Sequence, residues 1–193
     1  MNGVAIRFKD PSEALAAGIG LLPESRKEQG LITSFTILHN VSLNNYGKYL
    51  LGHFFINRRR EFQDARTAMQ QVRVKAPSPN TRVDNLSGGN QQKVVIARWI
   101  NHTMKVLIFD EPTRGIDVGA KAEIYTILKD LAAQGMSMIV VSSELPELIT
   151  LTDRMLVMSE HKIQGILMPE DYHQEAILKL AYGQSETPEG QNQ

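Results

Sequence analysis

The sequence predicts an α/β fold with a mostly parallel sheet flanked by helices and a separate helical subdomain. The continuous apolar run Val106–Phe109 is typical of a strand buried on both faces of a parallel sheet. A second such run follows at Met138–Val141. Between them lies an amphipathic helix whose apolar positions fall on one face: Ile124, Ile127, Leu128 and Leu131. Residues 31–75 instead carry longer amphipathic patterns without a clear strand, which predicts the helical part.

The amino-acid composition excludes several classes of protein. The 193 residues are 42% hydrophobic and carry no net charge, which suits one domain with a short tail and argues against a nucleic-acid binder. Cysteine is absent, so disulfides and thiolate metal sites are excluded. No window has the length of a signal-peptide core or a membrane span, so we expect a soluble or peripheral protein. The basic cluster at residues 58–60 is interpreted as a solvated helix face.

The N-terminal elements are predicted in order along the chain. Val4, Ile6 and Phe8 alternate with polar residues, as in a half-buried strand. A short helix begins after Asp10 and ends at Gly18, and a short buried strand follows at residues 19–22. Residues 23–27 form a charged turn.

The remaining elements follow from periodicity and chain breakers. Helical spacing is expected around residues 62–72, a break at residues 77–80, and a helix from about Gly88 to Asn101. Further on, we expect a short helix at residues 146–151 and two strands at residues 155–158 and 163–167. Residues 184–193 are polar and are predicted to be a disordered tail.

One segment with binding potential is Leu86–Lys93. Ser87 is a natural helix N-cap, and Gly88 and Gly89 let the backbone approach a ligand closely. Free N–H groups at a helix N-terminus suit phosphate. An ordinary glycine-rich cap is the alternative interpretation.

A second segment with potential chemistry is Val106–Thr113. Asp110 and Glu111 follow a buried strand, where open α/β sheets bind ligands. Asp110 suits Mg²⁺, and Glu111 suits the activation of a water molecule. A loop with two acidic residues is the alternative.

Taken together, and in this order, the two segments resemble ATP-binding cassette (ABC) ATPases over roughly residues 3–168. Residues 87–91 look like the signature motif, Phe109-Asp110-Glu111 like the end of the Walker B strand, and residues 114–121 like the D-loop. The resemblance implies a partial P-loop NTPase fold. It divides the chain into a partial catalytic core (1–30), a helical subdomain with the signature (31–100), a RecA-like core (101–183) and the tail.

Four runs make the chain similar to the second cassette of tandem monosaccharide-importer ATPases, with the related autoinducer importer as a rival. They are residues 23–27, 88–93, 114–117 and 142–147. Three departures from the family pattern stand out. The phosphate loop G-x-x-x-x-G-K-[ST] is absent and is expected to lie before Met1. Ser143 stands at the switch-histidine position, and Glu24 stands at the Q-loop glutamine.

The resemblance implies that each ATP lies between the phosphate loop of one cassette and the signature of another. The implied nucleotide-binding positions are Glu24, Ser87, Gly88, Gly89, Asn90, Gln91, Asp117 and Ser143. Asp110 would hold Mg²⁺, and Glu111 would be the catalytic base of a weaker site. The implied partners are a second cassette, a transmembrane sugar permease and, indirectly, a periplasmic sugar-binding protein, at the cytoplasmic face of the membrane.

Two alternatives remain at this point. The chain is a non-catalytic truncated or regulatory half-cassette, or it is an ABC ATPase of DNA repair or translation. The absence of long heptads and of basic arms speaks against the last. We expect no ATP hydrolysis by the isolated chain.

Overall fold

The computed structural model describes residues 3–52 and 54–182. Two compact units form, Met1–Val141 and Ser142–Gln193, and each is described by itself. The predicted tail at residues 184–193 lies outside the described residues.

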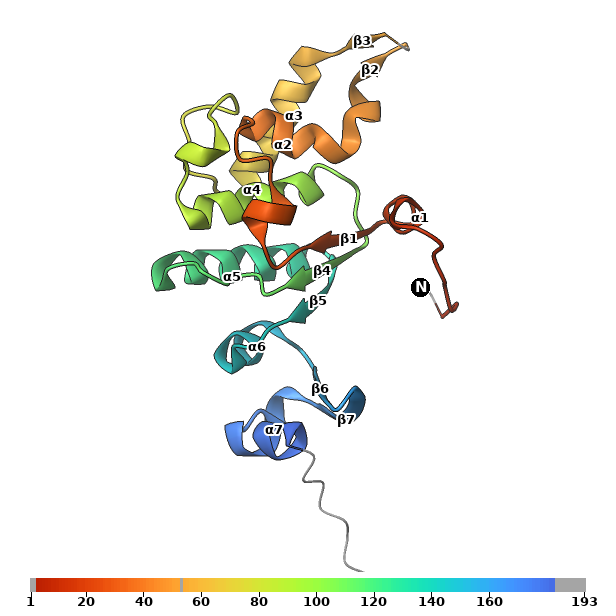
Figure 1. The fold of residues 1–193 in the computed structure, drawn as a ribbon, viewed down its shortest axis with the longest axis vertical. Helices are drawn as coiled ribbons and strands as arrows, with labels where there is room; N and C mark the ends of the chain where they lie inside the picture. Colours follow the sequence, from red (N-terminus) through yellow and green to blue (C-terminus); the bar gives the residue numbers. More distant parts are fainter. Residues whose placement is uncertain (1–2, 53, 183–193) are drawn as a thin grey trace, which may run out of the picture. The chain divides into compact units, whose positions relative to one another are not determined.

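The sheet of the first unit has three parallel strands in the order β1 (Ile19–Leu22), β4 (Val106–Asp110) and β5 (Ser137–Val141) (Figure 1). The parallel sheet and its strands were predicted. The prediction that these strands are buried on both faces of the sheet was wrong for the described part of the chain. Leu107 and Phe109 are fully buried, whereas Leu21 and Ile139, on neighbouring strands, are 49% and 53% exposed. Side chains alternate across a strand, so one face is covered and the other lies open.

Helix α4 (Gly88–Ile100) covers the closed face, next to α5 (Val118–Ala133). The approach of α4 to β1 depends on Gly20, where a Cβ atom would lie 2.8 Å from the ring of Trp99. The apolar side of α5 is buried, as its spacing predicted, and Gly135 ends that segment with a positive φ of 91°.

The N-terminal segment differs from prediction. Helix α1 (Pro11–Ala16) begins as expected, and Asp10 accepts hydrogen bonds from the backbone N–H of Ser12 and Glu13. Residues 4–8 form no strand, although their residues alternate. None of the described strands pairs with them, and Val4 is 65% exposed, so the pattern has neither a ladder nor a core to stabilise it.

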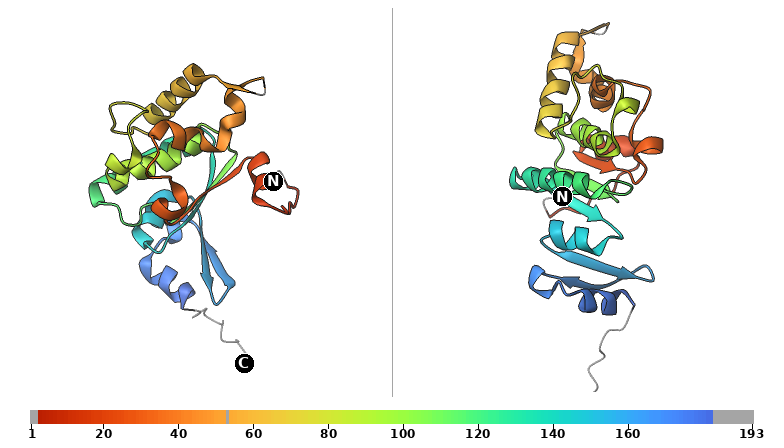
Figure 2. Two further views of the ribbon diagram at one scale, coloured as in Figure 1. Left: turned by 45° about the horizontal axis from the view of Figure 1, so that its top comes forward. Right: turned by 90° about the vertical axis from the view of Figure 1, so that its left-hand side faces the viewer.

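The helical subdomain is present between β1 and β4. It contains η1 (Arg26–Gly30), α2 (Ile37–Ser42), η2 (Leu43–Tyr49), α3 (Arg58–Gln71) and η3 (Val83–Asn85). Helices α2, α3 and α4 pack against one another (Figures 1 and 2). Sequence reasoning missed a hairpin of β2 (Leu50–Leu51) and β3 (Phe55–Ile56), whose strands are too short for a periodic signal.

The second unit contains α6 (Leu145–Leu151), an antiparallel pair β6 (Met155–Ser159) and β7 (Lys162–Leu167), η4 (Pro169–Asp171) and α7 (Gln174–Ala181). Its small core is built on Met155, Val157 and Ile177. The two strands and α6 were predicted, whereas α7 was not.

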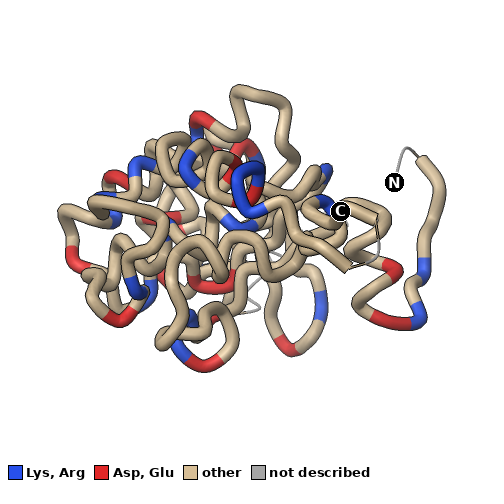
Figure 3. Tube along the Cα trace, turned by 90° about the horizontal axis from the view of Figure 1, so that it is seen from above, with Lys and Arg blue, Asp and Glu red and all other residues tan. Residues whose placement is uncertain are grey.

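Charged residues are mixed along the chain. Lys and Arg lie interspersed with Asp and Glu over the trace, in line with the zero net charge (Figure 3). Among the described residues, we find no helix with the length and apolar character needed to cross a membrane.

Candidate functional site

The candidate site begins at the N-terminus of α4. Ser87 lies in extended backbone directly before the helix, and its hydroxyl accepts from the side-chain amide of Asn90 at 3.1 Å. Ser87 is exposed, and Gly88 is partly exposed. Within the described part, the backbone N–H groups of Gly88 and Gly89 have no acceptor. Helix α4 therefore presents free donors at the positive end of its dipole.

Gly89 is required by close packing, whereas Gly88 lies against the end of a flexible side chain. A Cβ on Gly88 would lie 2.8 Å from the guanidinium of Arg26, and one on Gly89 would lie 2.6 Å from the Cβ of Ala120 on α5. Gly89 thus lets α4 and α5 approach each other. Gly88 lets a cation approach the helix N-terminus.

Arg26 is a site residue that the sequence analysis did not single out. Its Nη1 donates to the carbonyl of Arg114 at 2.9 Å, and its Nη2 donates to the carbonyl of Gly115 at 3.3 Å. The guanidinium thereby connects the segment after β1 to the loop after β4, beside Gly88. The only sequence signal for it was its membership of the charged run at residues 23–27.

Asp110 and Glu111 lie at the carboxyl end of the central strand, as predicted. Asp110 is the last residue of β4 and is partly buried. Glu111 has a φ of 48°, which is rare for a residue with a side chain, and its N–H donates to the carbonyl of Val141 at 2.9 Å. Strand pairing therefore fixes a strained turn directly after Asp110.

The loop after β4 places Asp117 and contacts Glu24. Asp117 caps α5 by accepting from the N–H of Ala120 at 2.9 Å. Glu24 forms an ion pair with Arg114. The carboxylate of Glu24, at the predicted Q-loop position, therefore pairs with a cation from the loop after β4.

The side chains of Asn90 and Gln91 both bond to backbone groups of the segment that precedes the helix. The amide oxygen of Asn90 accepts from the N–H of Lys75 at 2.8 Å. Gln91 is 6% exposed and donates to the carbonyl of Val83 at 3.1 Å. Their predicted contact with nucleotide stays a prediction. In this geometry both side chains support the loop that precedes the helix.

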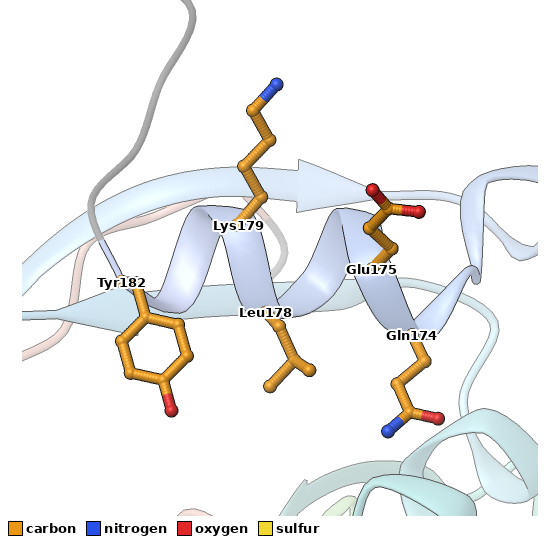
Figure 4. Close-up of a pocket in the computed structure, with 5 residues that line it drawn as sticks. All are labelled: Gln174, Glu175, Leu178, Lys179 and Tyr182. Carbon is orange, nitrogen blue, oxygen red and sulfur yellow. The ribbon is translucent and has the colours of Figure 1, made fainter.

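Ser143 belongs to the second unit, where it is exposed before α6. That unit also has a hollow over α7, lined by Gln174, Glu175, Leu178, Lys179 and Tyr182 (Figure 4). None of the predicted site residues lines it. It has no pair of strand-end carboxylates, so it is not the candidate site. In the described ranges, no group of three or more His, Asp or Glu could hold a metal ion by itself.

Comparison with known proteins agrees with this geometry. The family described as "ABC transporter" matches residues 1–114. The ribose import ATP-binding protein RbsA 1 of Burkholderia thailandensis is 56% identical over 86% of this chain and 33% of its own length. The galactose/methyl galactoside import ATP-binding protein MglA of Clostridium tetani is 42% identical over 94% of this chain and 36% of its own length. The chain thus spans about a third of the length of these relatives.

Solved structures show the same fold at low sequence identity. The ADP conformation of MJ1267, an ATP-binding cassette of an ABC transporter, gives a TM-score of 0.73 at 19% identity, over 91% of this chain and 72% of that one. A dimeric post-hydrolysis state of the cassette MJ0796, bound to ADP and Pi, gives 0.68 at 22% identity, over 83% and 68%. With a family match over residues 1–114 and relatives that are 42% and 56% identical over most of this chain, this protein belongs to the ABC transporter family.

Proposed function

We propose that this chain is ATP-binding machinery of an ABC transporter that imports a monosaccharide, and that it donates its signature motif to an ATP held by a partner cassette. The observation that carries the proposal is the N-terminus of α4, where Gly88 lies beside the guanidinium of Arg26 and the first N–H groups of the helix have no acceptor among the described residues. A helix N-terminus next to a cation favours a phosphate group.

In this proposal Ser87, Gly88 and Gly89 contact the γ-phosphate, and Arg26 adds positive charge. Asn90 and Gln91 hold the loop that presents them. Asp117 helps the two sites to sense each other, and Glu24 directs negative charge toward the metal and the phosphates. Ser143 stands where the family has its switch residue.

Mg²⁺ suits the carboxyl end of β4. This ion is bound through one or two carboxylates together with substrate phosphates, and Asp110 and Glu111 supply carboxylates there. Bound Mg²⁺ would neutralise phosphate charge. Asp110 would hold it, and Glu111 would be the catalytic base that orients water in the weaker site. The strained backbone at Glu111 supports a functional role for this turn.

The importer assignment rests on the relatives, which are named for ribose and galactose import. It implies a second cassette, a transmembrane permease and a periplasmic sugar-binding protein as partners, and a place at the cytoplasmic face of the membrane. Specificity for the sugar would lie in the permease and the binding protein.

The test combines this chain with a purified cassette of a tandem sugar ATPase that carries a phosphate loop. We expect no Mg-ATP hydrolysis by the chain alone and stimulated hydrolysis by the mixture. Ser87→Arg should abolish the stimulation, because it places bulk and charge where phosphate approaches. Ser12→Arg, on exposed α1, is the matched control and should leave the stimulation intact.

Two results would overturn the proposal. An unchanged stimulated rate in Ser87→Arg would mean that the signature is not used. Turnover by the chain alone that is lost in Glu111→Gln would show a complete site of its own. Binding to the partner cassette without stimulation would favour the alternative, a regulatory half-cassette.

A further inference from the structure

The β2–β3 hairpin exposes a cluster of large apolar side chains. Phe54 is 89% exposed, Phe55 is 73% exposed and Leu51 is 55% exposed. Leu51 and Phe55 lie opposite each other in the antiparallel register, so their side chains share one face of the hairpin. Figure 1 shows the hairpin projecting from the helical subdomain beyond α2 and α3. Single exposed apolar residues are ordinary, whereas a contiguous exposed patch marks an interaction site.

The charges beside this cluster are of one sign. Residues 47–60 contain Lys48 and the run Arg58-Arg59-Arg60, and they contain no Asp or Glu. Lys48 is paired with Asp64 at 2.8 Å, and Arg58 is paired with Glu61 at 3.2 Å. Arg59 and Arg60 are exposed and, within residues 3–52 and 54–182, have no ion-pair partner. The hairpin therefore ends in two unpaired cations on the first turn of α3.

Hydrogen bonds of the backbone and of a helix cap hold the apolar cluster close to the two unpaired arginines. The N–H of Asn57 donates to the carbonyl of Tyr49 at 2.7 Å and closes the base of the hairpin, and the side chain of Asn57 caps α3. Only three residues, Ile56, Asn57 and Arg58, separate Phe55 from Arg59 in the sequence. Tyr49 is buried, and its hydroxyl donates to Asn101 at 3.1 Å, so the base is anchored to the end of α4.

We propose that the β2–β3 hairpin is a membrane contact, in which Phe54, Phe55 and Leu51 enter the interface of an anionic bilayer while Arg59 and Arg60 bind its lipid headgroups. Aromatic side chains favour the headgroup region. Exposed Lys and Arg near an anionic surface each contribute to binding. A protruding tip without exposed acidic residues suits a deformable lipid surface, and the unpaired cations supply the charge complementarity. This role is independent of nucleotide binding at α4.

The experiment is sedimentation of the full chain with vesicles of phosphatidylcholine, alone or with about a quarter phosphatidylglycerol. We expect binding to the anionic vesicles that weakens with salt. Phe54→Ser/Phe55→Ser and Arg59→Glu/Arg60→Glu should each weaken it at least about tenfold. The controls, Ile163→Ser/Ile166→Ser and Lys129→Glu/Arg154→Glu, change exposed apolar and basic residues elsewhere and should bind as the parent does.

A labelled variant tests insertion directly. The chain has no cysteine, so Phe54→Cys carries a polarity-sensitive dye at one site, with Glu170→Cys as the control. Enhanced emission on anionic vesicles is expected for Phe54→Cys alone.

Three results would overturn the proposal. They are equal binding to neutral and anionic vesicles, no vesicle binding at all, and binding that the hairpin variants retain but Leu21→Thr/Ile139→Thr loses. The last would place lipid contact on the open face of the sheet. Loss of signature-dependent ATP turnover in Ser87→Arg bears only on the proposed function, because that variant leaves the hairpin unchanged.

Discussion

At Gly89 the distance between two helices depends on the absence of a side chain. We expect Gly89→Ala to destabilise the fold by about 1–3 kcal/mol, because the new methyl group would overlap the Cβ of Ala120 and push α4 from α5. Urea unfolding followed by circular dichroism measures this. Gly119→Ala, where the nearest atom lies 3.5 Å from the new Cβ, should be neutral or stabilising by up to about 1 kcal/mol. Equal stability of Gly89→Ala and the parent would show that the helices separate freely.

Glu123 is a second residue whose contribution to the stability of the fold can be measured. It accepts from Lys75 and Lys93, and these two cations lower its pKa from 4.5 to about 2. Lys93 is buried, with 2% of its side chain exposed, and its ammonium also donates to the carbonyl of Arg73 at 3.1 Å. A carboxylate whose folded-state pKa is depressed contributes stability above its unfolded-state pKa and loses it as pH falls through the folded value.

The parent should therefore lose stability between pH 4.5 and about 2 through this group. Glu123→Gln should lower the urea midpoint at pH 7 and should flatten that part of the pH profile. Glu175→Gln, in the second unit, is the control and should follow the parent. Parallel pH profiles for the parent and Glu123→Gln would refute the coupling.

Among elements, α2 and α4 are joined by a buried polar contact. Arg98 donates from Nε to the carbonyl of Asn40 at 2.8 Å and from Nη2 to its amide oxygen at 3.1 Å. Burial lowers the pKa of Arg98 to about 10, so the guanidinium stays charged at neutral pH and needs these acceptors. The side chain of Asn40 also bonds to both backbone groups of Ile32.

Asn40→Ala should cost about 2–3 kcal/mol, because it leaves a buried cation short of an acceptor. Asn80→Ala, an exposed residue, should change stability by less than about 0.5 kcal/mol. Thermal or urea unfolding of the two variants provides the comparison. A loss in Asn40→Ala no greater than in Asn80→Ala would mean that Arg98 finds other acceptors.

At the scale of helices and strands, some features could be predicted from the sequence and others could not. β4, α5 and the helix from Gly88 were predictable, because continuous apolar runs, helical spacing and an N-cap are local signals. The apparent strand at residues 4–8 failed because pairing is a tertiary property that alternation alone does not supply. Arg26 was not identified, because its position depends on carbonyls of Arg114 and Gly115, far along the chain. That Ser87 contacts an ATP held by a partner cassette, and that Asp110 belongs to a weaker site of this chain, stay predictions.

At the scale of the whole molecule, one face of the sheet exposes large apolar side chains. Leu21, Ile139 and Val141 are 49%, 53% and 52% exposed, and β1 and β5 are the outer strands of the three-stranded sheet. Parallel sheets are ordinarily covered on both faces, so this face favours contact with further apolar surface. We expect the purified chain to self-associate with rising concentration.

Leu21→Thr/Ile139→Thr should raise the monomer fraction in sedimentation velocity at a fixed concentration, because it removes apolar surface without removing a core contact. Phe54→Ser/Phe55→Ser separates the two exposed surfaces, since it should abolish vesicle binding and leave self-association unchanged. The opposite pattern, with the hairpin variant monomeric and the sheet variant still associating, would assign self-association to the hairpin. In that case the aromatic tip would pair copies of the chain, and the open sheet face would be stable in water by itself.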